Sequence, residues 1–159
     1  IGVVGAQSDD RSIASELWME DEMRVVVPAD HPWADRAQIS IDMLAKEPFI
    51  IRESGSGTLK SIQLRLSQAH RPLDDFNIVS EMGSTVAVIQ GIKSHVGISI
   101  LSPISITDEL NAGQLAMLRL HGVDLKRGFY LIHHRQRTMS PLAKAFLAYL
   151  RSAGSVTTD

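Results

Sequence analysis

Short apolar runs recur along the chain, each closed by glycine, proline or polar residues. Runs of this length and setting are typical of buried strands. They predict strands at residues 1–5, 23–27, 49–51, 76–81, 97–101, 115–120 and 129–133. Between strands, apolar residues recur at the spacing of one helix face, first at Leu59, Ile62, Leu66 and Ala69 and then at Val86, Ile89 and Ile92. Strand, turn and helix in this order predict an α/β fold with a parallel sheet covered on both faces.

Serine residues mark the starts of two further helices. Ser40 precedes a short segment of mixed apolar and polar residues, in the position of an N-cap. Ser140 and Pro141 have the residue types of an N-cap and a first helical position. The helix that they start would place Leu142, Phe146, Tyr149 and Leu150 on one side. Residues 152–159 are small and polar, so we expect a flexible tail there.

Composition and charge narrow the class of protein. Lys and Arg total 16 against 18 for Asp and Glu, which gives a net charge of −2. A chain that binds nucleic acid by itself normally has a basic surplus, so we expect no direct contact with DNA. The apolar runs are too short to span a bilayer, so we expect no membrane partner. The sequence has no cysteine, which excludes disulfides and thiolate chemistry and fits a reducing compartment such as the cytoplasm.

The strongest candidate chemistry follows the strand at 49–51. Ser54, Gly55, Ser56, Gly57 and Thr58 lead from this strand into a helix. The two glycines let the backbone approach a ligand, and the hydroxyls and first N–H groups of a helix can bind an anion or a carboxylate. A tight turn with an N-cap explains the same residues equally well, so both interpretations stay open. A P-loop is disfavoured because Thr58 stands where that motif requires lysine.

Two other turns follow predicted strands. Gly83 and Ser84 lie between a strand and a helix, where a simple capped helix is the more favoured explanation. Ala6, Gln7 and Ser8 follow the first strand and can offer N–H groups and an amide to the same cleft. Ligands of open α/β sheets bind beyond the carboxyl ends of the strands. We therefore predict that all these turns contribute to one ligand site.

The histidines and serines do not support catalysis. His133 and His134 are adjacent, so in a strand they point to opposite faces and cannot share a metal ion. The sequence contains neither a His-x-x-x-His pair nor a Gly-x-Ser-x-Gly elbow. We expect no metal, no cofactor and no catalytic residue, and we predict that the chain is not an enzyme.

Six short motifs occur in a specific order and spacing. They are IGVVG at 1–5, VVVPADHP at 25–32, EPFIIRESGSGT at 47–58, EMGST at 81–85, VGISIL at 96–101 and SPLAKAF at 140–146. Each motif is weak when taken alone. Together they resemble the effector-binding domain of LysR-type transcription regulators, nearly from end to end.

The resemblance implies a periplasmic-binding-protein-like fold of type II, with two α/β subdomains joined by crossing strands near 23–27 and 128–133. Residues 25–126 would form the second subdomain, and residues 1–24 with 127–151 would form an incomplete first subdomain. A small anionic or carboxylate effector would bind in the cleft between them and shift the conformation of a DNA-bound oligomer. The oligomer would be a homodimer or a tetramer.

The sequence also departs from this family. Members carry an N-terminal helix-turn-helix domain and further first-subdomain strands, which this sequence does not contain. We therefore expect that upstream sequence has been removed, and that DNA is contacted only through the missing N-terminal domain. Two alternatives stay open, namely an extracytoplasmic solute-binding protein of a transporter and, less favoured, an enzyme on the same architecture such as an aromatic-acid dehydratase.

Overall fold

The computed structural model describes residues 1–5 and 7–153. The chain divides into two compact units. The central unit is Glu22–Leu125, and the terminal unit combines Ile1–Asp21 with the chain from Lys126 onward. The chain therefore enters the central unit once and leaves it once, and each unit is described separately. Within the described residues, no helix has both the length and the apolar content needed to cross a bilayer.

The central unit contains a mixed sheet. One part has four hydrogen-bonded strands, in the spatial order β4 (Gln38–Ile39), β8 (Leu115–Leu120), β3 (Arg24–Pro28) and β7 (Ser99–Leu101). The other part is the pair β5 (Phe49–Arg52) and β6 (Ile78–Met82). A parallel bridge connects these two parts, because Ile50 N donates to Ile98 O and Ile98 N donates to Pro48 O, both at 2.8 Å. The pairs β4–β8 and β5–β6 are parallel, whereas β3 is antiparallel to both of its neighbours. The predicted parallel sheet is thus wrong for β3, because an apolar run carries no information on strand direction.

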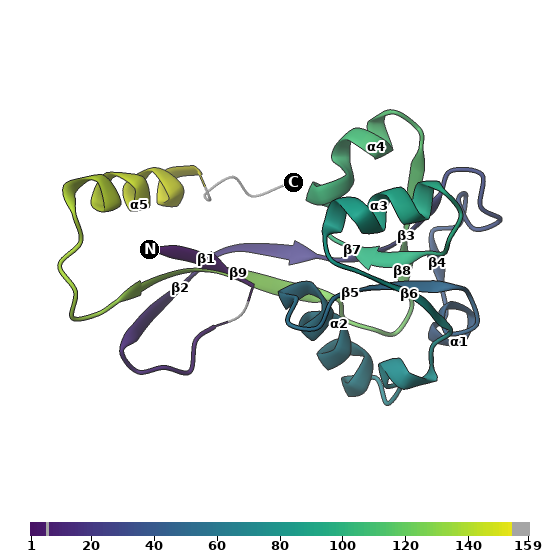
Figure 1. Cartoon of the computed structure of the whole chain (residues 1–159), viewed down its shortest axis with the longest axis horizontal. Coiled ribbons are helices and arrows are strands. Elements are labelled where there is room, and N and C mark those ends of the chain that lie inside the picture. The colour runs from purple at the N-terminus through teal and green to yellow at the C-terminus, as the bar shows by residue number, and fades with distance from the viewer. Residues whose placement is uncertain (6, 154–159) are drawn as a thin grey trace. The chain divides into compact units, whose positions relative to one another are not determined.

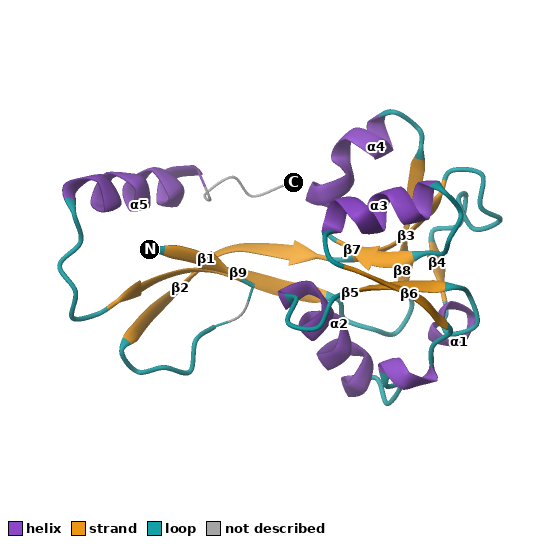
Figure 2. Cartoon of the chain, in the orientation of Figure 1, coloured by secondary structure: helices purple, strands orange, loops and turns teal. Residues whose placement is uncertain are grey.

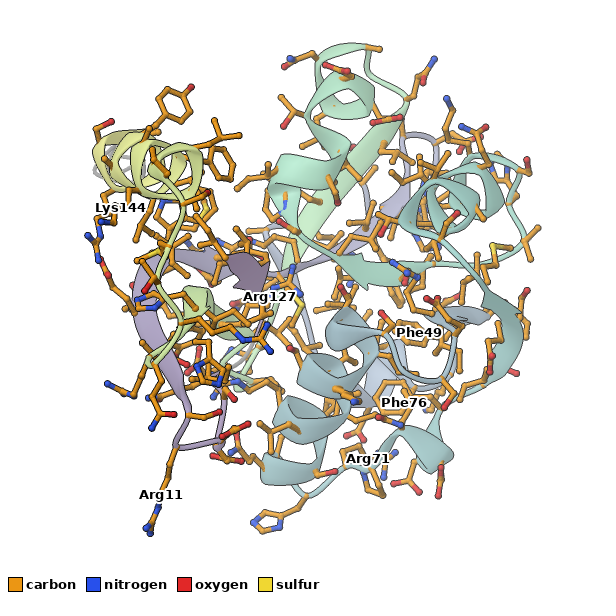
Figure 3. The ribbon with its side chains drawn as sticks, turned by 60° about the vertical axis from the view of Figure 1, so that its left-hand side comes forward. Arg11, Phe49, Arg71, Phe76, Arg127 and Lys144 are labelled. Carbon is orange, nitrogen blue, oxygen red and sulfur yellow. The ribbon has the colours of Figure 1, made fainter. Side chains whose placement is uncertain are left out.

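Helices cover both faces of this sheet, as Figure 2 shows, and this part of the prediction is confirmed. Alternate residues of β3 enter different cores, with Val25 and Val27 on one face and Val26 on the other. The first core receives Leu59, Ile62 and Leu66 from α2 (Gly57–Gln68), and the second receives Val88, Ile89 and Ile92 from α3 (Thr85–Lys93). The first core also contains Phe49 and Phe76, labelled in Figure 3, whose ring centroids are 5.6 Å apart.

Short helical segments complete the central unit. They are α1 (Ile41–Leu44), α4 (Thr107–Asn111) and two 3₁₀ turns at Leu73–Asp75 and Pro103–Ile106. The predicted N-cap of α1 is confirmed, since Ser40 Oγ accepts a hydrogen bond from Met43 N at 3.3 Å. Val86 was predicted on the buried face of its helix, but it is exposed, and Val88 is buried instead.

The terminal unit is a three-stranded sheet with one helix. The strand order is β1 (Gly2–Val4), β9 (Lys126–His134), β2 (Ile13–Glu22), and the helix is α5 (Pro141–Ala153). Leu147 and Leu150 of α5 pack with Leu131 of β9. Trp18 Nε1 donates to Leu150 O at 2.7 Å, so the indole is both packed and hydrogen-bonded. Ser140 Oγ accepts from Ala143 N at 3.2 Å, which confirms the predicted N-cap of this helix.

The terminal unit differs from the sequence prediction at three points. The first strand was predicted as buried and parallel, but β1 pairs antiparallel with β9 and Val3 is 46 % exposed. Strand β2 was not predicted, because its sequence IASELWMEDE mixes charged residues with apolar ones and contains no continuous apolar run. Helix α5 continues through Ser152 and Ala153, which were predicted as tail. The remainder of that predicted tail, 154–159, lies outside the described residues.

Candidate anion-binding site

Two of the predicted site turns are brought together by the pairing of β5 and β6 (Figure 1). These strands are parallel, with Arg52 opposite Met82 at their ends. Glu53 N then donates to Met82 O at 3.1 Å, which extends the contact into the turns. Residues 53–58 and 83–85 therefore lie beyond the same edge of the sheet, and a helix begins at each turn.

The first turn has a clear structural explanation. Ser56 N donates to Glu53 O at 3.1 Å, and Gly55 has a φ of +97°. A type II turn requires such a φ at its third residue, which favours glycine. Ser56 Oγ accepts from Leu59 N at 3.5 Å as the N-cap of α2, and Ser56 is only 8 % exposed. The turn-and-cap interpretation thus accounts for Gly55 and Ser56, and their contact with a ligand stays a prediction.

Polar groups of both turns lie on the surface. Ser54 and Gly57 are exposed and Thr58 is half-buried. At the second turn Gly83 and Ser84 are exposed, and Ser84 Oγ accepts from Ala87 N at 3.1 Å as the N-cap of α3. Backbone N–H groups in the first turn of a helix have no partner within the helix, and they carry the positive end of its dipole. Neither first turn contains an acidic residue, so the two helix starts together favour an anion.

Arg52 connects the two turns. Its Nε and Nη2 donate to the two carboxylate oxygens of Glu53 at 2.7 and 2.8 Å, and its Nη1 donates to Thr85 Oγ1 at 2.6 Å. The hydrogen bonds from Arg52 lower the pKa of the Glu53 carboxyl, and those to Glu53 raise the pKa of the Arg52 guanidinium. Sequence reasoning did not single out Thr85, which is 33 positions from Arg52, and nothing local in the sequence signals this contact.

The third predicted turn belongs to the terminal unit. Ala6 lies outside the described residues. Gln7 is exposed, and Ser8 is hydrogen-bonded locally, since its N–H donates to Ser15 Oγ and its Oγ accepts from Asp10 N, both at 3.3 Å. The participation of these three residues in a ligand site stays a prediction.

A shallow hollow of about 130 Å³ lies at the opposite edge of the central sheet. It is formed where β5 and β7 begin, by Pro28, His31, Glu47, Pro48, His95, Gly97 and Ile98. None of the predicted site residues lines it. Among residues 1–5 and 7–153, no three His, Cys, Asp or Glu side chains are arranged to hold a metal ion.

Comparison with known protein families and sequences gives a consistent result. The family model described as the LysR substrate binding domain matches residues 1–155. The uncharacterized HTH-type transcriptional regulator YeiE of Escherichia coli K12 is 35 % identical over 149 residues, which are 94 % of this chain and 50 % of YeiE. The RuBisCO operon transcriptional regulator of Acidithiobacillus ferrooxidans is 31 % identical over 96 % of this chain and 48 % of its own length. The chain thus spans about half the length of the curated relatives it matches.

Solved structures share the fold. The regulatory domain of CcmR from Synechocystis PCC6803, in complex with 2-PG, matches with a TM-score of 0.85 and 27 % identity over 97 % of this chain and 73 % of that one. The effector-binding domain of QuiR, in complex with shikimate, matches with a TM-score of 0.81 and 22 % identity over 96 % of this chain and 70 % of that one. At that lower identity the second likeness shows the fold alone.

Proposed function

This chain belongs to the LysR substrate-binding domain family, and we propose that it is the effector-sensing part of a bacterial transcription regulator. The observation that carries this proposal is the pair of helix starts at one sheet edge, held beside the Arg52 guanidinium. The curated relatives are described as transcription regulators, which favours this function over a solute-binding protein of a transporter. It also favours a binding role over an enzymatic one.

The proposed effector is a small molecule with a carboxylate or a phosphate group. Two helix dipoles and one guanidinium attract negative charge, whereas the exposed hydroxyls of Ser54 and Ser84 can select the shape of the ligand. The CcmR regulatory domain, which is similar to this chain along most of its length, was solved with 2-PG bound. A ligand of this kind is therefore a rational first probe.

The proposed mechanism is a shift between conformations of the protein. A ligand changes such an equilibrium only by the difference in its affinity for the two states. With a net charge of −2, this chain has no basic surplus for binding DNA, so in our proposal DNA is contacted through another part of a cytoplasmic homodimer or tetramer. The effector would then act on DNA binding through the geometry of that oligomer.

Calorimetry on the full-length protein tests the site. We expect 2-PG, inorganic phosphate or a related carboxylate to bind, and Thr58→Val and Ser54→Ala to weaken that binding by roughly tenfold or more each, because a hydrogen bond to a charged group contributes about 1.5–3 kcal/mol. Ser67→Ala is the matched control, since Ser67 is an exposed serine near the other end of α2. Equal affinities in all four proteins would remove these turns from the site.

A further inference from the structure

The Arg52 guanidinium is already occupied by a carboxylate of its own chain. Glu53 receives two of its hydrogen bonds in a bidentate arrangement, at 2.7 and 2.8 Å. The Arg52 side chain is only 17 % exposed, whereas that of Glu53 is 36 % exposed. The cation is therefore held in place at the sheet edge, and its partner has one side open to water.

This pairing presents a difficulty for an anionic ligand. A carboxylate or phosphate placed at the starts of α2 and α3 would meet the negative charge of Glu53 together with the positive charge of Arg52. As long as the pair is closed, the two charges largely cancel at the distance of a ligand. The attraction of Arg52 becomes available only if Glu53 moves away.

The contacts around the pair allow the carboxylate of Glu53 to move while Arg52 stays. The backbone of Glu53 is fixed, because its N–H donates to Met82 O and its carbonyl accepts from Ser56 N. Only the exposed side chain of Glu53 is then left to rotate. Arg52 keeps a second anchor, since its Nη1 donates to Thr85 Oγ1 at 2.6 Å, a bond that does not involve Glu53. Thr85 is thus a positioning residue for the guanidinium.

We propose that Glu53 is a place-holding carboxylate. It occupies the bidentate face of Arg52 in the ligand-free protein, and the carboxylate or phosphate of the effector replaces it there. This inference rests on the proposed function. It adds the group that the effector must carry, namely a carboxylate or phosphate whose two oxygens can accept a bidentate pair of hydrogen bonds from a guanidinium. Glu53 is then a specificity-determining residue, because a ligand without such a group cannot displace it.

The test compares two glutamates at the same end of the sheet. Glu53→Gln keeps the shape of the side chain but removes the competing charge. Glu81→Gln removes the same charge from an exposed position of β6 that faces Ile51 in the ladder, without opening the Arg52 pair. In full-length protein titrated with 2-PG and inorganic phosphate, we expect Glu53→Gln to tighten binding by roughly two- to fivefold, the range of an exposed ion pair. Glu81→Gln should change it by clearly less.

A spectroscopic readout follows the carboxyl group of Glu53 in the wild-type protein. In wild-type protein, the carboxyl pKa of Glu53 followed by carbon-13 NMR should rise toward its ordinary value when phosphate is added, because the ligand takes the hydrogen bonds that lower it. An unchanged Glu53 pKa under saturating phosphate, or equal effects of the two substitutions, would overturn the place-holding role and leave the proposed function standing. If no anion binds to the wild type or to either variant, the proposed function fails and the inference fails with it.

Discussion

At the scale of single residues, the surroundings of His31 favour the neutral form of its ring. Its Nδ1 accepts the backbone N–H of Trp33 at 3.2 Å, and its ring lies edge-on to the buried Trp33 ring with 5.0 Å between centroids. A protonated Nδ1 could not accept that bond. Burial lowers the pKa of His31, and this outweighs the nearby charges of Glu47 and Asp30, which raise it; His95 lowers it slightly further.

The lowered His31 pKa predicts a dependence of stability on pH. The unfolded chain binds a proton at this residue as the pH falls through about 6.5, whereas the folded chain binds that proton less readily. The free energy of unfolding therefore decreases as the pH is lowered through that range. His31→Asn keeps an oxygen that can accept the Trp33 N–H but cannot titrate. We expect the free energy of unfolding, measured in urea at pH 7.5 and 5.5, to fall less in this variant than in wild type. Equal losses would show that His31 contributes nothing to the pH response.

At the scale of elements, the contact between β5 and β7 depends on one glycine. A Cβ added to Gly97 would lie 2.5 Å from the carbonyl oxygen of Pro48, which is backbone and cannot rotate away. The same carbonyl accepts from Ile98 N, the bond that joins the two parts of the central sheet. The close approach of these chains, and with it the position of the β5–β6 edge, therefore requires glycine at this position.

Gly97→Ala should consequently destabilise the central unit. We expect a loss of about 1–3 kcal/mol in the free energy of unfolding, the usual cost of inserting a carbon into a filled space. Gly57→Ala serves as the control, because a Cβ at that first position of α2 meets no atom within 4 Å and alanine favours the helix. The stabilities of the two variants are compared by their denaturant unfolding midpoints. A Gly97→Ala protein as stable as the control would contradict the close-approach argument.

At the scale of the whole molecule, each unit has a core of its own. The two clusters of the central unit lie on opposite faces of its sheet, whereas Leu131, Leu147 and Leu150 form the core of the terminal unit. On the other side of α5, Leu142, Phe146 and Tyr149 are exposed, Leu142 to 80 %. The terminal unit therefore relies on a small core for its stability.

This division predicts where a core substitution acts. Leu147→Ala should cost about 2–5 kcal/mol and accelerate amide hydrogen exchange in β9 and α5, while the strands of the central unit keep their protection. Leu142→Ala, on the exposed face of the same helix, should change stability by less than about 0.5 kcal/mol. Exchange that accelerates equally in both units would indicate a single cooperative core.

Much of the fold could be predicted from local patterns. The helix starts at Ser40, Ser56, Ser84 and Ser140 follow from residue types that cap helices, and the buried face of α2 follows from its apolar spacing. The turn that carries Gly55 could also be predicted from residue type alone, because a positive φ favours glycine whatever surrounds it. The ordered motifs likewise identified the family. The caps, the turn and the helix face each depend on residues close together in the sequence, whereas the family follows from the order of short motifs along the chain.

Other features depend on contacts between distant segments, and local patterns do not contain them. The buried side of α5 is one example, because its apolar residues cover a wide arc and only the sheet beneath selects Leu147 over Phe146. The reversed direction of β3 is another. The link from Arg52 to Thr85 is a third. Each is decided by packing between segments that lie far apart in the sequence. The sequence thus located the turns of the candidate site, and the parallel pairing of β5 and β6 placed two of them side by side.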